Sequence, residues 1–189
     1  MSQRYGGYTK KVKIYMKILI FSDSHGRSAN MLKAIELHPD AELILHLGDG
    51  TDDLKDVSQR YPSLNVKHVK GNKEDGLFGN GNDSPFLVEA LGDKTVYLCH
   101  GHRYNVSYTE QNLIYSAICN NADIVLYGHT HVKENKYLSE VSQDENGQKK
   151  GLYVFNPGSI SRPRDGIYPS YGIMEIRNDG ILLSHGLIK

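Results

Sequence analysis

Clusters of Asp, His and Asn follow apolar runs at five places in the chain. The clusters are Asp23-Ser24-His25, Gly48-Asp49-Gly50, Gly71-Asn72, His100-Gly101-His102 and Gly128-His129-Thr130-His131. Carboxylates and imidazoles bind hard or borderline divalent ions, an Asp can bridge two ions, and an Asn carbonyl adds a neutral oxygen ligand. Because thiolate clusters are missing from the sequence, a structural zinc site is not expected. The pattern predicts a site for divalent metal ions.

Two adjacent ions would suit an in-line displacement at phosphorus. In binuclear sites the ions lie roughly 3.5–4 Å apart, and the pKa of a bound water falls to about 7, so that hydroxide is available at neutral pH. Each motif alone has a simpler interpretation, because Asp-x-His occurs by chance and Gly-Asp or Gly-Asn is an ordinary turn. Their combination, each after an apolar run, favours the metal site.

The apolar runs have the composition of buried β-strands. They are Ile18–Phe21, Leu43–Leu47, Val66–Val69, Val96–Leu98 and Ile124–Leu126. The carboxyl ends of parallel strands form the crevice where α/β proteins bind ligands. We therefore expect the clusters to meet in space, although two to three dozen residues separate them along the chain.

Helical and hairpin patterns complete the expected fold. Ser28 lies near the start of a helix that Pro39 ends, and Ser107 with Glu110 forms a possible capping box for a helix up to Ala122. Hairpins are predicted at two dipeptides, Asn146-Gly147 and Asp179-Gly180. A βα-rich first part followed by hairpins predicts two mixed sheets packed together with helices outside.

Composition and charge limit the class of protein. A chain of 189 residues with 39% hydrophobic residues predicts one domain. Lys plus Arg total 22 and Asp plus Glu total 22, so no overall basic field attracts long nucleic acid or an anionic membrane. Residues 1–15 are basic and lack acids, which predicts a disordered leader or an over-extended start before a single domain over 16–189.

The expected location is the cytoplasm. No apolar run approaches the length of a membrane span, and the N-terminus lacks the apolar region of a secretory signal. The two cysteines, Cys99 and Cys119, do not form a CxxC pair, which fits a reducing compartment.

The ordered motifs, together with Asn156-Pro157-Gly158-Ser159, resemble those of the calcineurin-like metallophosphoesterase superfamily. The chain is most similar to its small single-domain YfcE-type phosphodiesterase branch, over Met16 to Lys189. The resemblance implies an α/β (α+β) fold: a four-layer αββα sandwich of two mixed β-sheets flanked by helices, with the metal site at one edge. It also implies a binuclear phosphodiesterase that hydrolyses a small phosphodiester through a metal-bridging hydroxide.

The resemblance assigns the ligands of both ions, residue by residue. One ion would have Asp23, His25 and His131, the other Asn72, His100 and His129, and Asp49 would bridge the two. Mixed Asp, His and Asn ligation admits Mn, Fe, Ni, Co or Zn. The resemblance favours manganese as the activating ion.

Catalytic and substrate roles are less completely specified. The candidate catalytic residues are Asn72, which would stabilise charge on the phosphoryl oxygens, His100, and His102, which would orient the His100 region. Larger family members carry a histidine after the Gly-Asn pair, whereas this chain carries Lys73, so the general acid is unassigned, with Lys73 and His102 as candidates. Candidate substrate contacts are Ser24, Arg27, Lys73 and Arg162. Helix capping and solvation explain Ser24 and Arg27 equally well, a solvated surface position is the simpler interpretation of Lys73, and Arg162 could instead contact a subunit neighbour.

Three functions remain open on the sequence. A small phosphodiester is favoured as substrate, because no obvious cluster of positive groups marks a site for the second charge of a phosphomonoester. Phosphomonoesterase activity on the same site is the alternative within this chemistry. A non-catalytic protein-interaction scaffold, as in the retromer subunit with this fold, is the other class, but no ligand position is missing here. A homo-oligomer is possible, although no amphipathic surplus marks an interface.

Overall fold

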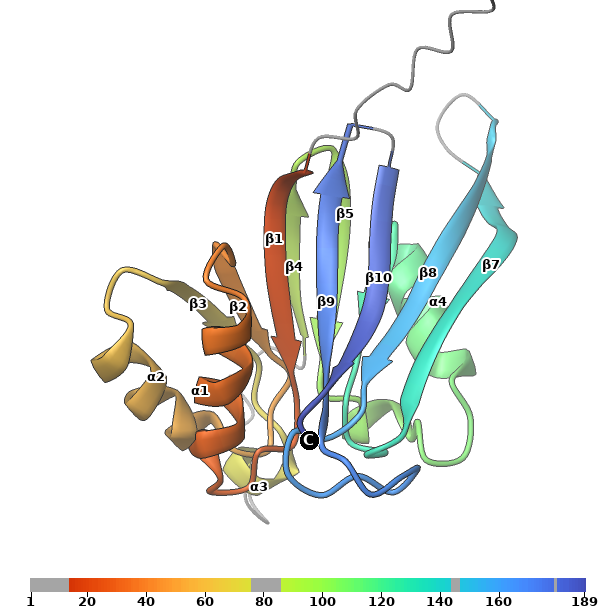
Figure 1. Ribbon diagram of the computed structural model, residues 1–189. Helices are drawn as coiled ribbons and strands as arrows, with labels where there is room; N and C mark the ends of the chain where they lie inside the picture. Colours follow the sequence, from red (N-terminus) through yellow and green to blue (C-terminus); the bar gives the residue numbers. More distant parts are fainter. Residues whose placement is uncertain (1–13, 76–85, 144–146, 179) are drawn as a thin grey trace, which may run out of the picture.

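Two five-stranded β-sheets form the centre of the computed structural model, which describes residues 14–75, 86–143, 147–178 and 180–189 (Figure 1). The first sheet has the order β10-β9-β1-β2-β3, with bounds β1 (Ile14–Phe21), β2 (Leu43–His46), β3 (Asn65–His68), β9 (Ser170–Arg177) and β10 (Gly180–Leu187). The second has the order β4-β5-β6-β8-β7, with bounds β4 (Phe86–Leu91), β5 (Lys94–Cys99), β6 (Ile124–Leu126), β7 (Lys133–Gln143) and β8 (Lys149–Pro157).

Both sheets are mixed, as predicted. The strands β1, β2 and β3 run parallel to one another, and so do β5, β6 and β8. The strands β9, β10, β4 and β7 are antiparallel to their neighbours. The β7–β8 and β9–β10 pairs confirm the predicted hairpins, although the turn residues Asn146 and Asp179 lie outside the described residues.

Helices cover the outer face of each sheet (Figure 1). The helices α1 (Ser28–Leu37) and α2 (Leu54–Arg60) pack on the first sheet, and α4 (Gln111–Cys119) packs on the second. Three short helices lie in loops: η1 (Thr51–Asp53), α3 (Asn72–Asp75) and η2 (His102–Tyr104).

Apolar side chains on alternating strand positions supply three core layers. Ile20 and Leu45 of the first sheet meet Leu98, Leu126 and Phe155 of the second between the sheets. The other strand faces pack against the helices, because successive side chains point to opposite faces of a sheet. Examples are Phe21 and Ile44 against Met31 of α1, and Tyr97 and Val125 against Leu113 of α4. This arrangement confirms the four-layer αββα sandwich.

Two local expectations were wrong. The segment around Val66 is an edge strand and not one buried on both faces: β3 pairs only with β2 among the described strands, and its ends Asn65 and His68 are exposed. The helix predicted to begin at Ser107 begins at Gln111, and Glu110 does not cap it. The Glu110 carboxylate instead accepts hydrogen bonds from the Tyr127 hydroxyl and Lys136 Nζ.

The domain starts slightly earlier than expected. The strand β1 begins at Ile14, which pairs with Arg177 of β9, so two residues assigned to the leader belong to the sheet. Residues 1–13 lie outside the described residues. Within the described ranges, no helix is long and apolar enough to cross a membrane.

Candidate metal centre

The loops that follow β1, β2, β3, β5 and β6 meet at one edge of the sandwich. Backbone hydrogen bonds join them: Asp23 N–H donates to Gly48 O (3.0 Å), and Gly128 N–H donates to His100 O (3.1 Å). The loops approach so closely that only glycine fits at two of the contacts. A Cβ on Gly48 would lie 2.5 Å from the backbone nitrogen of Gly71, and one on Gly128 would lie 1.9 Å from Ser22 Oγ.

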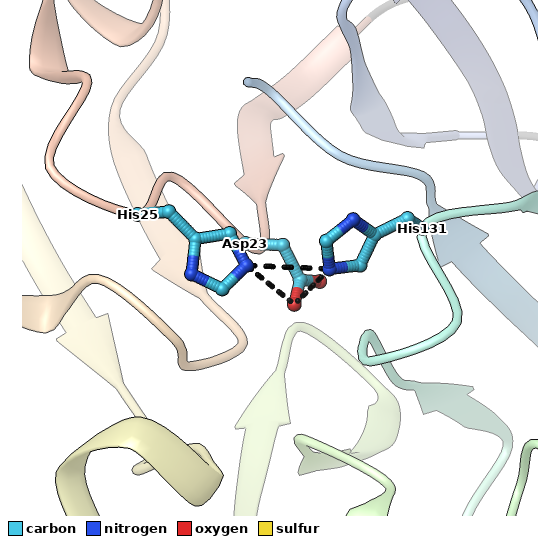
Figure 2. A group of neighbouring side chains, drawn as sticks. All are labelled: Asp23, His25 and His131. Carbon is cyan, nitrogen blue, oxygen red and sulfur yellow. Dashed lines mark hydrogen bonds and ion pairs between the residues drawn. The ribbon is translucent and has the colours of Figure 1, made fainter. Parts of the chain in front are cut away.

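Asp23, His25 and His131 point toward one another in the first ligand group (Figure 2). Nε2 of His131 lies 3.1 Å from Asp23 Oδ1 and 3.3 Å from Nε2 of His25. The distance from His25 Nε2 to Asp23 Oδ1 is 3.8 Å. One potential ligand atom from each residue therefore lies within 4.8 Å of the other two.

The neighbours of this group leave its ligand atoms free for a cation. Asp23 Oδ2 accepts hydrogen bonds from the Ser22 hydroxyl (2.6 Å) and from His129 N–H (3.0 Å). Asp23 Oδ1 is buried without a hydrogen-bond partner among the described residues. Nδ1 of His131 donates to the Arg162 carbonyl (2.7 Å), so Nε2 of the same ring faces the carboxylate. Because a buried carboxylate oxygen without a hydrogen-bond partner is costly, a bound cation would satisfy Asp23 Oδ1.

A second group is built in the same way around His100. Nδ1 of His100 donates to the Leu47 carbonyl (2.7 Å), which leaves Nε2 facing Asn72 Oδ1 at 3.2 Å and Asp49 Oδ1 at 3.5 Å. Nδ1 of His129 lies 3.1 Å from the same Asn72 oxygen. The structure thus brings Asn72, His100 and His129 together.

Asp49 lies between the two groups. Its Oδ1 faces His100, whereas its Oδ2 lies 3.9 Å from His25 Nε2 in the first group. Lys73 N–H donates to Oδ1 (2.8 Å), which fixes the carboxylate. One carboxylate with an oxygen toward each group has the placement that bridging requires, and this oxygen-and-imidazole donor set fits two divalent ions.

Several predicted ligands adopt a backbone conformation that side-chain-bearing residues avoid. The φ angles are 57° for Asp23, 48° for His25, 57° for Asp49, 70° for His129 and 59° for His131. Positive φ is uncommon outside glycine, and such strain persists only where the surrounding structure enforces it, most often at functional sites. The fold therefore holds these side chains at an energetic cost.

Burial and neighbouring charges set the protonation of the first group. Burial opposes charge on Asp23, but the nearby imidazoles of His131 and His100 outweigh it, so the pKa of Asp23 lies below its usual range. Burial also disfavours charge on His131, yet the Asp23 carboxylate raises its pKa. Burial lowers the pKa of both His25 and His129. These two imidazoles are neutral at neutral pH, as metal ligands must be.

Glu74 is a residue of the site that sequence reasoning missed. Its Oε1 accepts N–H groups of Gly50 (2.6 Å) and Thr51 (2.9 Å), and its Oε2 accepts those of Gly71 (2.7 Å) and Asp49 (3.0 Å). Burial opposes the charge, but these donors lower the pKa of Glu74 to about 2. The carboxylate ties the Asp49 loop to the start of α3. An acid three residues after Gly71 at a helix start was the available signal.

The Asn156–Ser159 motif forms hydrogen bonds to the loops that carry the predicted ligands. Asn156 is fully buried, and its Nδ2 donates to the Gly128 carbonyl (3.0 Å) and to Thr130 Oγ1 (3.1 Å). The Ser159 hydroxyl donates to the Asp23 carbonyl (2.9 Å). The motif therefore positions ligand loops of both sheets without itself reaching the site.

Ser24 does not have the position predicted for a substrate contact. It is fully buried, its hydroxyl donates to the Gly50 carbonyl (3.1 Å), and its oxygen lies 3.1 Å from His46 Nε2. His46, to which the sequence assigned no role, accepts Gly48 N–H at Nδ1 (3.2 Å). Burial lowers the pKa of His46 to about 4. Both side chains support the ligand loops from inside the fold.

The other predicted contacts divide into two sets. A hollow of about 540 Å³ opens over the ligands, and Lys73, Arg162 and Arg164 all line it. Arg27 precedes α1 and is not among the residues that line this hollow, so its predicted substrate contact is not supported.

His102, a candidate catalytic residue, lies beside the second group, with its ring centroid 5.3 Å from that of His100. The cationic side chains of Lys73, Arg162 and Arg164 around the hollow contradict the expectation that no positive cluster marks the site.

Comparisons with known proteins find relatives in sequence and in structure. A family model described as a calcineurin-like phosphoesterase superfamily domain matches residues 16–179. The probable metallophosphoesterase YsnB of Bacillus subtilis (strain 168) is 30% identical over 166 residues, which cover 87% of this chain and 86% of that protein. The phosphodiesterase YfcE of Escherichia coli (strain K12) is 27% identical over 180 residues, which cover 85% of this chain and 88% of that one.

Among solved structures, a predicted phosphoesterase from Streptococcus pneumoniae TIGR4 superposes with a TM-score of 0.62 at 25% identity. The match covers 92% of this chain and 98% of that one. Sequence and structure therefore point to the same group of proteins.

Proposed function

Because the chain belongs to the calcineurin-like phosphoesterase superfamily, we propose that it is a binuclear metal-dependent phosphodiesterase that hydrolyses a small phosphodiester. The observation that supports this most directly is the buried Asp23 Oδ1, which has no hydrogen-bond partner in the described chain and faces imidazole nitrogens. Asp49 extends the same arrangement to the His100 group.

The residues of the two groups would divide the work of metal binding. One ion would be held by Asp23, His25 and His131, the other by Asn72, His100 and His129, with Asp49 shared between them. Two divalent ions there, which we propose to be manganese, supply an activated water and positive charge for the phosphoryl oxygens when bound.

The protein's own groups would orient and attract the substrate. The carbonyls of Leu47 and Arg162 fix the rings of His100 and His131, and such partners of metal ligands commonly set affinity. Lys73 and Arg162 line the hollow over the ligands and would hold the phosphate of the ester there. Lys73 and His102 remain the candidates for protonating the leaving group.

Phosphomonoesterase activity is a second candidate that one observation favours. Lys73, Arg162 and Arg164 come from two loops distant in sequence and line the same hollow. Three cations beside a metal centre would complement the second negative charge of a monoester. We therefore expect measurable turnover of monoesters alongside diesters.

The decisive experiment combines metal content with turnover. Protein purified without chelator is analysed by elemental mass spectrometry and assayed with bis-p-nitrophenyl phosphate and p-nitrophenyl phosphate, with and without added manganese. We expect bound divalent metal, diester turnover that EDTA abolishes, and recovery when manganese is returned. Metal-loaded protein that turns over neither ester would contradict the proposal and leave the non-catalytic scaffold as the better account.

The sequence and structure also support proposals on the partner, the cellular compartment and the oligomeric state. We propose a small phosphodiester as partner and no long nucleic acid, because the chain carries no net basic charge. A reducing, cytoplasmic setting fits two free cysteines, of which Cys99 is buried and Cys119 exposed. Homo-oligomerisation stays a prediction, to be checked by light scattering.

A further inference from the structure

A second hollow adjoins the candidate metal centre. It has a volume of about 690 Å³, against about 540 Å³ for the hollow over the ligands. His25, Lys73 and Arg162 line both. A molecule that places a phosphoryl group at the metal centre therefore has room to extend past these three residues into the second hollow.

Polar side chains and glycines make up the walls of the second hollow, and most of the exposed wall surface is polar. Its remaining lining residues are Gly26, Gly50, Thr51, Asp52, Asp53 and Glu74, none of which carries an apolar side chain. An aryl or alkyl group placed there would desolvate these polar groups without pairing them, which costs free energy. The composition favours an occupant that forms hydrogen bonds.

The hollow is built on fixed backbone. Asp53 Oδ2 accepts Gly26 N–H (2.9 Å), which links the loop after β1 to η1. Glu74 accepts the N–H of Thr51 (2.9 Å) and of Gly50 (2.6 Å), which fixes the backbone of these two lining residues. A Cβ on Gly26 would meet no atom within 4 Å, so the space beside it is open.

The charges of the walls select among polar occupants. Asp52 and Asp53 would repel an anionic group, and Lys73 and Arg162 would repel an ammonium group. A hydroxyl both donates and accepts, so a neutral diol can pair with carboxylates and cations together. The Thr51 hydroxyl, which has no hydrogen-bond partner among the described residues, adds a group that can do either.

We propose that the second hollow is the subsite for one ester arm of the substrate, and that this arm is a small neutral diol such as glycerol or ribose. The inference rests on the proposed function, because it places the phosphoryl group of the same molecule at the metal centre. Thr51 and Asp53 are then specificity-determining residues.

A set of esters with a common leaving group tests the subsite. The p-nitrophenyl phosphodiesters of glycerol, uridine (through its 5′ oxygen), ethanol and phenol release the same p-nitrophenolate, so differences in kcat/KM report on the second arm. We expect the glyceryl or uridyl ester to exceed both the ethyl and the phenyl ester by about tenfold, equivalent to about 1.4 kcal/mol. Which diol ester is faster distinguishes a glycerol arm from a ribose arm.

Two conservative variants localise the preference. Thr51→Val removes the hydroxyl but keeps the backbone N–H that Glu74 accepts, and Asp53→Asn keeps an oxygen for Gly26 N–H. Each should lower the ratio of diol to ethyl kcat/KM toward one. Asp93→Asn is the control, because it removes an exposed carboxylate in the β4–β5 turn and should change neither the ratio nor the rates.

A binding readout separates this inference from the proposed function. In EDTA-treated protein, glycerol 1-phosphate and uridine 5′-phosphate should shift the NMR amide signals of Thr51 and Asp53 more than ethyl phosphate does. If these shifts occur but the same protein hydrolyses neither ester after manganese is returned, the proposed function is refuted and the subsite is kept. An active enzyme that shows neither a diol preference nor these shifts would overturn the subsite and keep the function.

Discussion

Glu74→Gln is the substitution for which the structure makes its sharpest prediction. The native carboxylate accepts four backbone N–H groups, two at each oxygen, from Asp49, Gly50, Thr51 and Gly71. A glutamine amide has one oxygen and one NH₂ group. In either orientation its NH₂ faces two backbone donors, so the variant loses two hydrogen bonds and places donors against donors.

The expected cost is about 3 kcal/mol in the free energy of unfolding. A hydrogen bond to a charged group contributes about 1.5–3 kcal/mol, so the loss of two gives about 3–6 kcal/mol. The lower end applies because Gly50 and Thr51 border the second hollow, where water can replace part of the lost bonding. Since the tie also positions Asp49 and Asn72, we expect manganese affinity to fall by about 10–100-fold.

Urea unfolding of EDTA-treated protein, followed by far-UV circular dichroism, measures the first quantity, and calorimetric titration with manganese measures the second. The matched control is Glu36→Gln, which removes an exposed carboxylate paired with Arg60 (2.8 Å). Surface ion pairs contribute about 0–1 kcal/mol, so this variant should resemble wild type in both assays. A Glu74→Gln protein that also matches wild type would refute the idea that the Glu74 carboxylate ties the loops together.

Three further predictions concern residues around the same edge. Asp49→Ala removes the carboxylate that faces both ligand groups, so diester turnover should fall by at least about 100-fold; near-normal rates would defeat its assignment as the shared ligand. Asn156→Ala strands buried partners in the Gly128 loop and should lower the free energy of urea unfolding by about 2–4 kcal/mol, which an unchanged midpoint and slope would disprove. His46 has a folded pKa of about 4 against an ordinary value of 6.5, so only the unfolded chain takes up its proton as pH falls from 6.5 to 4. Wild type should therefore lose about 3 kcal/mol more stability than His46→Gln over that interval, with no such difference above pH 6.5; parallel pH profiles of the two proteins would contradict this.

The sequence alone determined the fold class and the residue types that gather at one edge of the sheets. Apolar runs such as Ile18–Phe21 specify buried strands through local composition, and the glycine next to Asp49 permits the sharp turn that the ligand needs. Parallel strands have their carboxyl ends at one edge, so Asp23 and His131 were expected to meet although they are distant in sequence. In the structure, Asp23 Oδ1 lies 3.1 Å from His131 Nε2. These inferences succeeded because they depend on neighbours in sequence and on one topological rule.

Only the tertiary structure decided which side chains support or surround the ligands. Glu74 reads as a surface acid in a polar segment, and its role depends on loop backbone up to 25 residues away. Lys73, Arg162 and Arg164 became a cationic cluster only when the loops after β3 and β8 came together. Glu110 does not cap the helix as predicted, and its carboxylate accepts hydrogen bonds from Tyr127 and Lys136, which are distant in sequence. A side-chain hydrogen bond is chosen by proximity in space, and distances between loops are set by the packing of the two sheets and not by local sequence.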